Sequence, residues 1–167
     1  VDLVALNDTL NGVTERPADS LTDVRLNTQN QALKASNKTF TLPVFLDHTG
    51  SLTAIKGYIE AAPDFMVLES IELSDRVADD HEIRVQDEGN GRMRYVVYSL
   101  TNAPITGTEG VIMEIKGILS ETAQIGQTGT VCVACEELTS PGGVSQRWCY
   151  AYADISVVLD GDANGDG

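Results

Sequence analysis

The last six residues of the sequence have the types and spacing of a calcium-binding loop. They read D-A-N-G-D-G, which matches the first half of the loop pattern D-x-N-x-D-G. In such a loop the residues at positions 1, 3 and 5 turn oxygen atoms toward one point, and the glycine at position 6 permits a sharp turn. Asp162, Asn164 and Asp166 would supply three of the roughly six to eight oxygen ligands that Ca²⁺ requires.

The printed sequence ends at Gly167, before the backbone carbonyl of position 7 and the carboxylate of position 12 of such a loop. We therefore expect residues 162–166 to form an incomplete calcium loop. We also expect residues 1–167 by themselves to bind no cofactor. Ca²⁺ is expected to bind only where a continuation of the chain completes the loop. The alternative interpretation is a solvated acidic tail that binds no metal.

A second set of candidate residues lies near residue 150, where apolar and aromatic side chains alternate. Successive side chains on a strand point to opposite faces. One face of residues 147–159 is apolar, and the other carries Trp148, Tyr150 and Tyr152. If the apolar face packs on the core, the three rings form an exposed row that can stack on sugar rings or anchor a protein. The alternative is a bulge near Ala153, which would reverse the register and bury the rings.

Three cysteines, Cys132, Cys135 and Cys149, suggest metal binding or a disulfide. Cys132 and Cys135 have C-x-x-C spacing, but strand residues three apart point to opposite faces, and no second C-x-x-C or H-x-x-x-H completes a zinc site. A turn at residues 141–143 would bring Cys135 opposite Cys149, which makes these two a candidate disulfide. The alternative is that the cysteines are buried as small apolar side chains.

The sequence lacks the residue combinations of common enzymes. His48 and His81 each fall in an expected turn or loop, and no G-x-S-x-G, H-E-x-x-H or glycine-rich phosphate loop is present. Carboxylates gather around His81 in residues 75–82, which we interpret as a solvated loop, with a weak cation site as the alternative. We therefore predict that the protein is not an enzyme.

Composition argues against several kinds of partner. Eleven Lys and Arg against 25 Asp and Glu give a formal net charge of −14 over 167 residues. Nucleic acids and anionic membranes need a basic surface, so we expect neither as a partner. No apolar run approaches the roughly 20 residues that cross a bilayer, so we expect no membrane insertion. The length suits one domain with its own core.

Alternation of apolar and polar residues recurs along the chain, and no segment sustains helical periodicity. The expected strands are residues 24–33, 40–46, 52–61, 65–73, 82–86, 92–100, 111–119, 130–138 and 147–159. The pattern predicts an all-β fold, a two-sheet jelly-roll or immunoglobulin-like β-sandwich of about nine strands. We assign the sandwich to residues 24–160, an N-terminal extension or linker to residues 1–23, and the start of the calcium loop to residues 161–167.

Several of these segments resemble those of a cohesin module. The matching pieces are the proline-bearing strand at 40–44, residues 55–58, residues 63–73, the Ser-Leu-Thr-Asn run at 99–102, residues 105–110 and the apolar strand at 111–115. The extension at 1–23 and the cysteine-containing final hairpin depart from the cohesin pattern. The tail at 162–167 resembles the start of a dockerin, the small duplicated calcium-loop module of bacterial polysaccharide-degrading systems.

The resemblance implies a jelly-roll sandwich whose flat face receives a dockerin. It also implies a secreted, multimodular bacterial protein at the cell surface that takes part in polysaccharide handling or surface assembly. We therefore expect a non-catalytic protein–protein interaction module, with a dockerin or another surface protein as its partner. The aromatic row leaves a carbohydrate-binding module with a polysaccharide ligand as one alternative, and a structural spacer domain is another.

Overall fold

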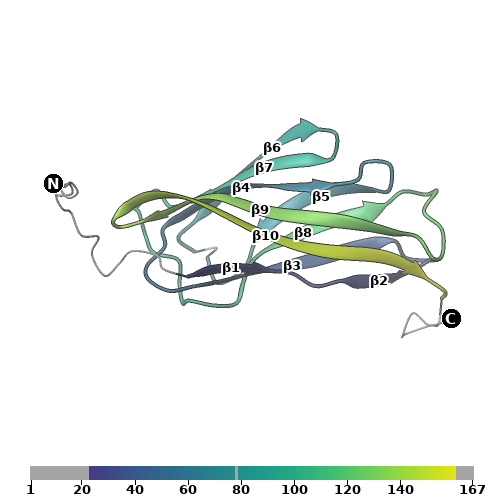
Figure 1. Ribbon diagram of the computed structural model, residues 1–167, viewed down its shortest axis with the longest axis horizontal. Coiled ribbons are helices and arrows are strands. Elements are labelled where there is room, and N and C mark those ends of the chain that lie inside the picture. Colours follow the sequence, from purple (N-terminus) through teal and green to yellow (C-terminus); the bar gives the residue numbers. More distant parts are fainter. Residues whose placement is uncertain (1–22, 78, 161–167) are drawn as a thin grey trace, which may run out of the picture.

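The computed structural model describes residues 23–77 and 79–160, and these form ten strands in two facing sheets (Figure 1). The smaller sheet has the order β1 (Val24–Asn27), β3 (Thr39–His48), β8 (Val111–Leu119) and β5 (Met66–Leu73). The larger sheet has the order β2 (Gln31–Lys34), β10 (Gly143–Val158), β9 (Thr128–Ser140), β4 (Ala54–Ala61), β7 (Arg92–Tyr98) and β6 (Glu82–Gly89). None of the described residues belongs to a helix that could cross a membrane. The predicted all-β, two-sheet sandwich is confirmed.

Ten strands are present because the segment predicted as one edge strand at 24–33 divides into two. β1 pairs with β3 in the smaller sheet, whereas β2 pairs with β10 in the larger sheet, the one parallel pairing among the described strands. At the crossing between the sheets, Thr28 Oγ1 donates to the carbonyl of Pro43, and Asn30 Oδ1 accepts from the amide of Asp154. These side-chain bonds satisfy backbone groups where the ladders are interrupted.

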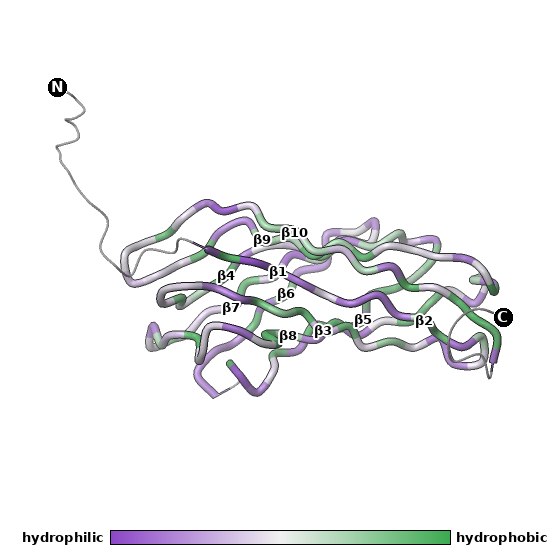
Figure 2. The backbone as a smooth tube through the Cα atoms, turned by 60° about the horizontal axis from the view of Figure 1, so that its bottom comes forward, coloured by the Kyte–Doolittle hydropathy of each residue, from purple (hydrophilic) through white to green (hydrophobic). Residues whose placement is uncertain are grey.

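Apolar side chains from both sheets fill the space between them. Burial alternates along β3, where Leu42, Val44 and Leu46 are completely buried. The same alternation of hydrophobic and hydrophilic residues is visible along the strands in Figure 2. It is the pattern of a sheet with one face on the core and the other in water. The polar set of each strand therefore lies on the outside of the sandwich, where a partner can reach it.

One close approach sets the middle of the larger sheet. The register between β4 and β9 shifts between Lys56 and Gly57. A Cβ atom added at Gly57 would lie 2.0 Å from the carbonyl oxygen of Ala134 and 2.8 Å from the hydroxyl of Tyr95. The buried Tyr95 hydroxyl donates to the same carbonyl at 2.9 Å. The volume that a side chain would need is therefore already occupied, and β4, β9 and β7 meet tightly at this point.

Arg76 ties the connection before β6 to two other parts of the chain. Its guanidinium donates to the carbonyl oxygens of Leu46 at 2.7 Å, Thr106 at 2.6 Å and Gly110 at 2.9 Å. It also lies 3.1 Å from Nε2 of His48. Because a guanidinium can only donate, Nε2 must accept, which holds His48 as the neutral imidazole.

Candidate functional site

The outer side of β9, β4, β7 and β6 carries a continuous set of polar and aromatic side chains, which we name the broad face. Pairing across the four strands makes neighbours of residues that are far apart in the sequence. The broad face consists of Lys56, Tyr58, Glu60, Glu82, Arg84, Gln86, Glu88, Arg92, Arg94, Val96, Tyr98, Glu136 and Glu137. On β4 and β7 the residues between them point inward, among them the buried Ile55, Ile59 and Val97. On the edge strand β6 the residues on the opposite side, such as Val85, stay exposed.

A chain of ion pairs holds the centre of the broad face together. Arg92 contacts Glu60 at 3.1 Å and Glu88 at 3.2 Å. Arg94 contacts Glu88 at 3.0 Å and also pairs with Glu136. The hydrogen bond from Arg94 lowers the pKa of the Glu88 carboxyl, which keeps that side chain ionised. The two arginines therefore sit in a fixed arrangement between carboxylates from β4, β6 and β9.

Charge on the broad face is nearly balanced, in contrast to the rest of the chain. Four basic and five acidic side chains lie on it, a net charge of −1, so the remaining residues carry −13 of the formal net charge of −14. The guanidinium of Arg92 also lies 3.6 Å from the centroid of the Tyr58 ring, a cation–π contact. An acidic or neutral molecule can approach this face without the repulsion that the rest of the surface imposes.

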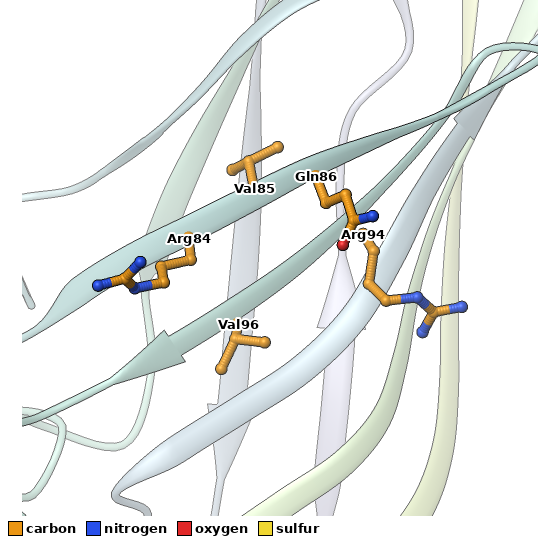
Figure 3. Close-up of a pocket in the computed structure, with 5 residues that line it drawn as sticks. All are labelled: Arg84, Val85, Gln86, Arg94 and Val96. Carbon is orange, nitrogen blue, oxygen red and sulfur yellow. The ribbon is translucent and has the colours of Figure 1, made fainter.

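A hollow of about 460 Å³ opens at the β6 and β7 side of the broad face (Figure 3). Four of its lining residues, Arg84, Gln86, Arg94 and Val96, belong to the broad face, and the fifth, Val85, lies on the opposite side of the edge strand β6. The two arginines are held from outside the hollow, because Arg84 donates to the hydroxyl of Tyr98 and Arg94 is paired with carboxylates. A mixed lining of this kind suits a side chain of a protein partner that has both an apolar part and a polar end.

Trp148, Tyr150 and Tyr152 lie in a row on the outer side of β10, and we name them the aromatic strip. They are 57%, 45% and 62% exposed, whereas the residues between Tyr150 and Ile155 on the opposite side of the strand are buried. The rings of Tyr150 and Tyr152 have centroids 6.5 Å apart and planes inclined by 17°. β10 does carry a register shift, but before Cys149, and it leaves the rings outside. The alternative in which a bulge buries them is wrong.

Cys135 and Cys149 are direct partners in the register of β9 and β10. Both thiols are free, and each donates to a backbone carbonyl, Cys135 to Glu137 at 3.9 Å and Cys149 to Val24 at 3.8 Å. The neighbouring Cys135 thiol lowers the pKa of Cys149 to about 7, and the Cys149 thiol together with burial raises the pKa of Cys135. Cys132 lies on the outer side of β9, where it is the register partner of Tyr152. The disulfide between Cys135 and Cys149 stays a prediction.

The other candidate residues do not assemble into a site. Asp162, Asn164 and Asp166 lie outside the described residues, so the calcium loop stays a prediction. Within residues 23–77 and 79–160 no three potential metal ligands come together, which leaves the alternative of a weak cation site near His81 without support. Nε2 of His81 lies 3.0 Å from the carbonyl of Thr53.

The broad face was not identified from the sequence. The signal available was the alternation of Arg92 and Arg94 on one side of a predicted strand, with Glu60 on another predicted strand and Glu88 two residues beyond the end of a third. Which carboxylate meets which arginine depends on the pairing register of four strands, and no single strand contains that information.

No protein-family model matches the sequence, and no curated protein matches it either. Solved structures do share the fold. The cohesin in a type I cohesin–dockerin complex of OlpA from Clostridium thermocellum has a TM-score of 0.68 at 10% identity, over 82% of this chain and 100% of that one. The sixth cohesin of scaffoldin B from Acetivibrio cellulolyticus, solved with a Cel5 dockerin, has a TM-score of 0.64 at 12% identity, over 81% and 99%.

A third similar structure is the type III cohesin of the cell-surface anchoring scaffoldin ScaE from Ruminococcus flavefaciens. Its TM-score is 0.63 at 15% identity, and the match covers 80% of this chain and 87% of that one. The chain therefore has a cohesin-like fold. At these identities the likeness concerns the fold alone, and the function has to be argued from the surface.

Proposed function

We propose that this chain is a non-catalytic protein-binding module and that its broad face receives a dockerin-type module. The likeness of fold supports this class of partner, because two of the similar structures are cohesins in complex with dockerins. The observation that carries the proposal is the nearly balanced charge of the broad face on a chain whose formal net charge is −14. The arginines on that face offer hydrogen-bond donors that a partner's carboxylates and amides can share.

The broad face also offers the residue types that anchor protein interfaces. Tyr and Arg are enriched among the residues that contribute most to binding. Tyr58 and Arg92 provide such a pair at its centre. The absence of catalysis is supported by the two histidines, since His48 and His81 are both engaged with backbone carbonyls.

The proposal extends to the setting that the cohesin resemblance implies. We infer that the parent protein is secreted, multimodular and attached to a bacterial surface, with residues 1–23 as a linker and residues 161–167 as the start of a dockerin-like module. Detection of the parent protein in the culture fluid or cell-wall fraction of the source organism tests this inference. Retention in the cytoplasm would contradict it.

Titration calorimetry against calcium-loaded dockerin modules of the source organism tests the partner. We expect at least one to bind, and we expect Arg92→Ala and Tyr58→Ala each to weaken that binding about tenfold or more. Both side chains are on the surface, so the variants should keep the melting temperature of the parent chain within a few degrees.

Lys116→Ala is the matched control. Lys116 forms a comparable cross-strand ion pair with Glu72, at 3.1 Å, but on the outer side of the smaller sheet. Removing it should leave binding unchanged. Failure of every folded, calcium-loaded dockerin to bind would overturn the proposal and favour a spacer domain. An equal loss in Lys116→Ala would move the docking surface to the smaller sheet.

A further inference from the structure

The aromatic strip ends at an open recess that the proposed protein partner does not explain. The recess has a volume of about 370 Å³ and lies where β4, β9, β10 and the turn between β6 and β7 meet. Tyr152 forms one wall, and Glu60, Asn90, Thr130 and Cys132 also line it. Its volume lies within the range of small-molecule sites, about 300–1,000 Å³. Its lining combines an aromatic ring with an amide, a carboxylate and a hydroxyl.

The turn that carries Asn90 is held firmly at the rim of the recess. Asn90 and its two glycine neighbours all have positive φ angles, of 55° for Asn90, 83° for Gly89 and 80° for Gly91. The carbonyl of Gly91 accepts from the amide of Ala61 at 2.9 Å. A Cβ atom at Gly91 would lie 2.1 Å from the carbonyl oxygen of Ala61, so only glycine permits this contact. The position of Asn90 is therefore fixed against the end of β4.

The polar groups of the recess retain capacity for hydrogen bonds. Among the described residues the Asn90 side-chain amide has no hydrogen-bond partner, and Glu60 uses only Oε2 to accept from Arg92. Thr130 Oγ1 donates to Asp154 at 2.8 Å, which leaves its oxygen able to accept. The recess therefore offers both hydrogen-bond donors and acceptors. These suit a ligand with several hydroxyl groups, since a hydroxyl both donates and accepts.

The aromatic strip extends this chemistry along β10. Alternate strand residues are about 6.8 Å apart, and the Tyr150 and Tyr152 rings lie 6.5 Å apart with nearly parallel planes. Aromatic faces carry partial negative charge, and the C–H groups on the face of a pyranose ring present partial positive charge to them. Trp148 continues the row in the direction away from the recess.

We propose that the recess and the aromatic strip bind a neutral, linear polysaccharide. One pyranose ring lies against Tyr152 with its hydroxyls at Glu60 and Asn90, and the following rings stack over Tyr150 and toward Trp148. Glu60, Asp154 and the net charge of −14 disfavour polymers of uronic acids. This inference goes beyond the protein-binding function and does not depend on it.

Native affinity electrophoresis of the whole chain tests the proposal. The probes are two neutral polymers, hydroxyethylcellulose and galactomannan, and the acidic polymer polygalacturonate. We expect at least one neutral polymer to retard the chain and polygalacturonate to leave it unaffected. The single tryptophan of the chain, Trp148, provides a second readout, because its fluorescence should shift when a glycan covers the aromatic strip.

Variants separate stacking from hydrogen bonding. Tyr152→Ala should weaken retardation about tenfold, whereas Tyr152→Phe keeps the ring and should remain within about threefold of the parent. Asn90→Asp, which tolerates the left-handed turn but removes the amide donor, should weaken it about fivefold. Leu100→Ala is the control, since Leu100 is 79% exposed and lies outside the recess and the aromatic strip.

Two outcomes would overturn the proposal. One is the absence of retardation with both neutral polymers while the chain is shown to be folded. The other is retardation that survives both Tyr150→Ala and Tyr152→Ala unchanged. If no glycan binds but Tyr152→Ala weakens a dockerin, the aromatic strip belongs to the protein interface. If a glycan binds and no dockerin does, the protein-binding proposal fails and the glycan proposal stands.

Discussion

At the scale of single residues, the absence of a side chain at Gly57 allows β4, β7 and β9 to pack closely. Gly57→Ala would place a Cβ atom against the carbonyl of Ala134 and the hydroxyl of Tyr95. Backbone on one side leaves little room to relax, so we expect the free energy of unfolding to fall by about 3 kcal/mol. Urea unfolding followed by circular dichroism measures this change.

Tyr95→Phe serves as the comparison, because it removes the hydroxyl that donates to Ala134 without adding an atom. We expect it to lower the free energy of unfolding by about 1–2 kcal/mol. A loss at Gly57 no larger than this would show that the strands can separate to admit a side chain.

Sequence inspection could place Gly57 inside a strand, but the close contact involves β7 and β9 and could not be derived from β4 alone.

At the scale of elements, the β9–β10 hairpin places the thiols of Cys135 and Cys149 where they can form a disulfide. With oxidised glutathione as the oxidant, Cys135 and Cys149 should lose two protons and two electrons to form a disulfide, while the oxidant is reduced to two glutathione thiols. Direct register partners have the separation that a disulfide needs. A closed loop of about 15 residues should stabilise the chain by about 3 kcal/mol.

Mass spectrometry should show the loss of two hydrogens, and the melting temperature should rise when the bond forms. Cys149→Ser should abolish both effects, whereas Cys132→Ser should leave them, because Cys132 lies on the outer side of β9. Mixed disulfides with glutathione in place of the internal bond would contradict the pairing. Alternation along β10 left two interpretations of the aromatic rings open, and the structure has the one in which they are exposed.

Other features of the elements could not be predicted. Residues 24–33 have one alternating pattern, yet they divide between two sheets because side chains of Thr28 and Asn30 satisfy the backbone at the crossing. The parallel pairing of β2 with β10 joins residues more than 100 positions apart. The alternation of side chains within one strand does not indicate which distant strand it pairs with. For the same reason the broad face could not be predicted, because its ion pairs join the four strands β4, β6, β7 and β9.

At the scale of the whole molecule, stability should depend on pH through His48. Burial is the main cause that lowers the pKa of His48, the Gly50 carbonyl opposes it, and the charge of Arg76 adds to it. The pKa in the folded state therefore lies below the value of about 6.5 in the unfolded chain. The unfolded state binds the proton more readily, so this stability is present above about pH 6.5 and is lost as the pH falls through the folded-state pKa.

Melting temperatures measured between about pH 7.5 and pH 5 check this expectation. The parent chain should lose stability across the interval, and His48→Gln should lose less, because a glutamine does not titrate and its amide oxygen can still accept from Arg76. A parallel decline in both proteins would assign the loss to other groups.

Composition alone could show that two histidines exist, but the contact between His48 and Arg76 required the fold.

The division of the first strand also determines how the domain meets mechanical load. β2 and β10 run parallel, and they lie near the two ends of residues 23–160. Tension that pulls those ends apart reaches β2 through β1, and it acts on β2 and β10 in opposite directions along the strand axis. The hydrogen bonds between them are then sheared together and not opened one after another, so the pairing of the first and last parts of the sandwich acts as a clamp against force.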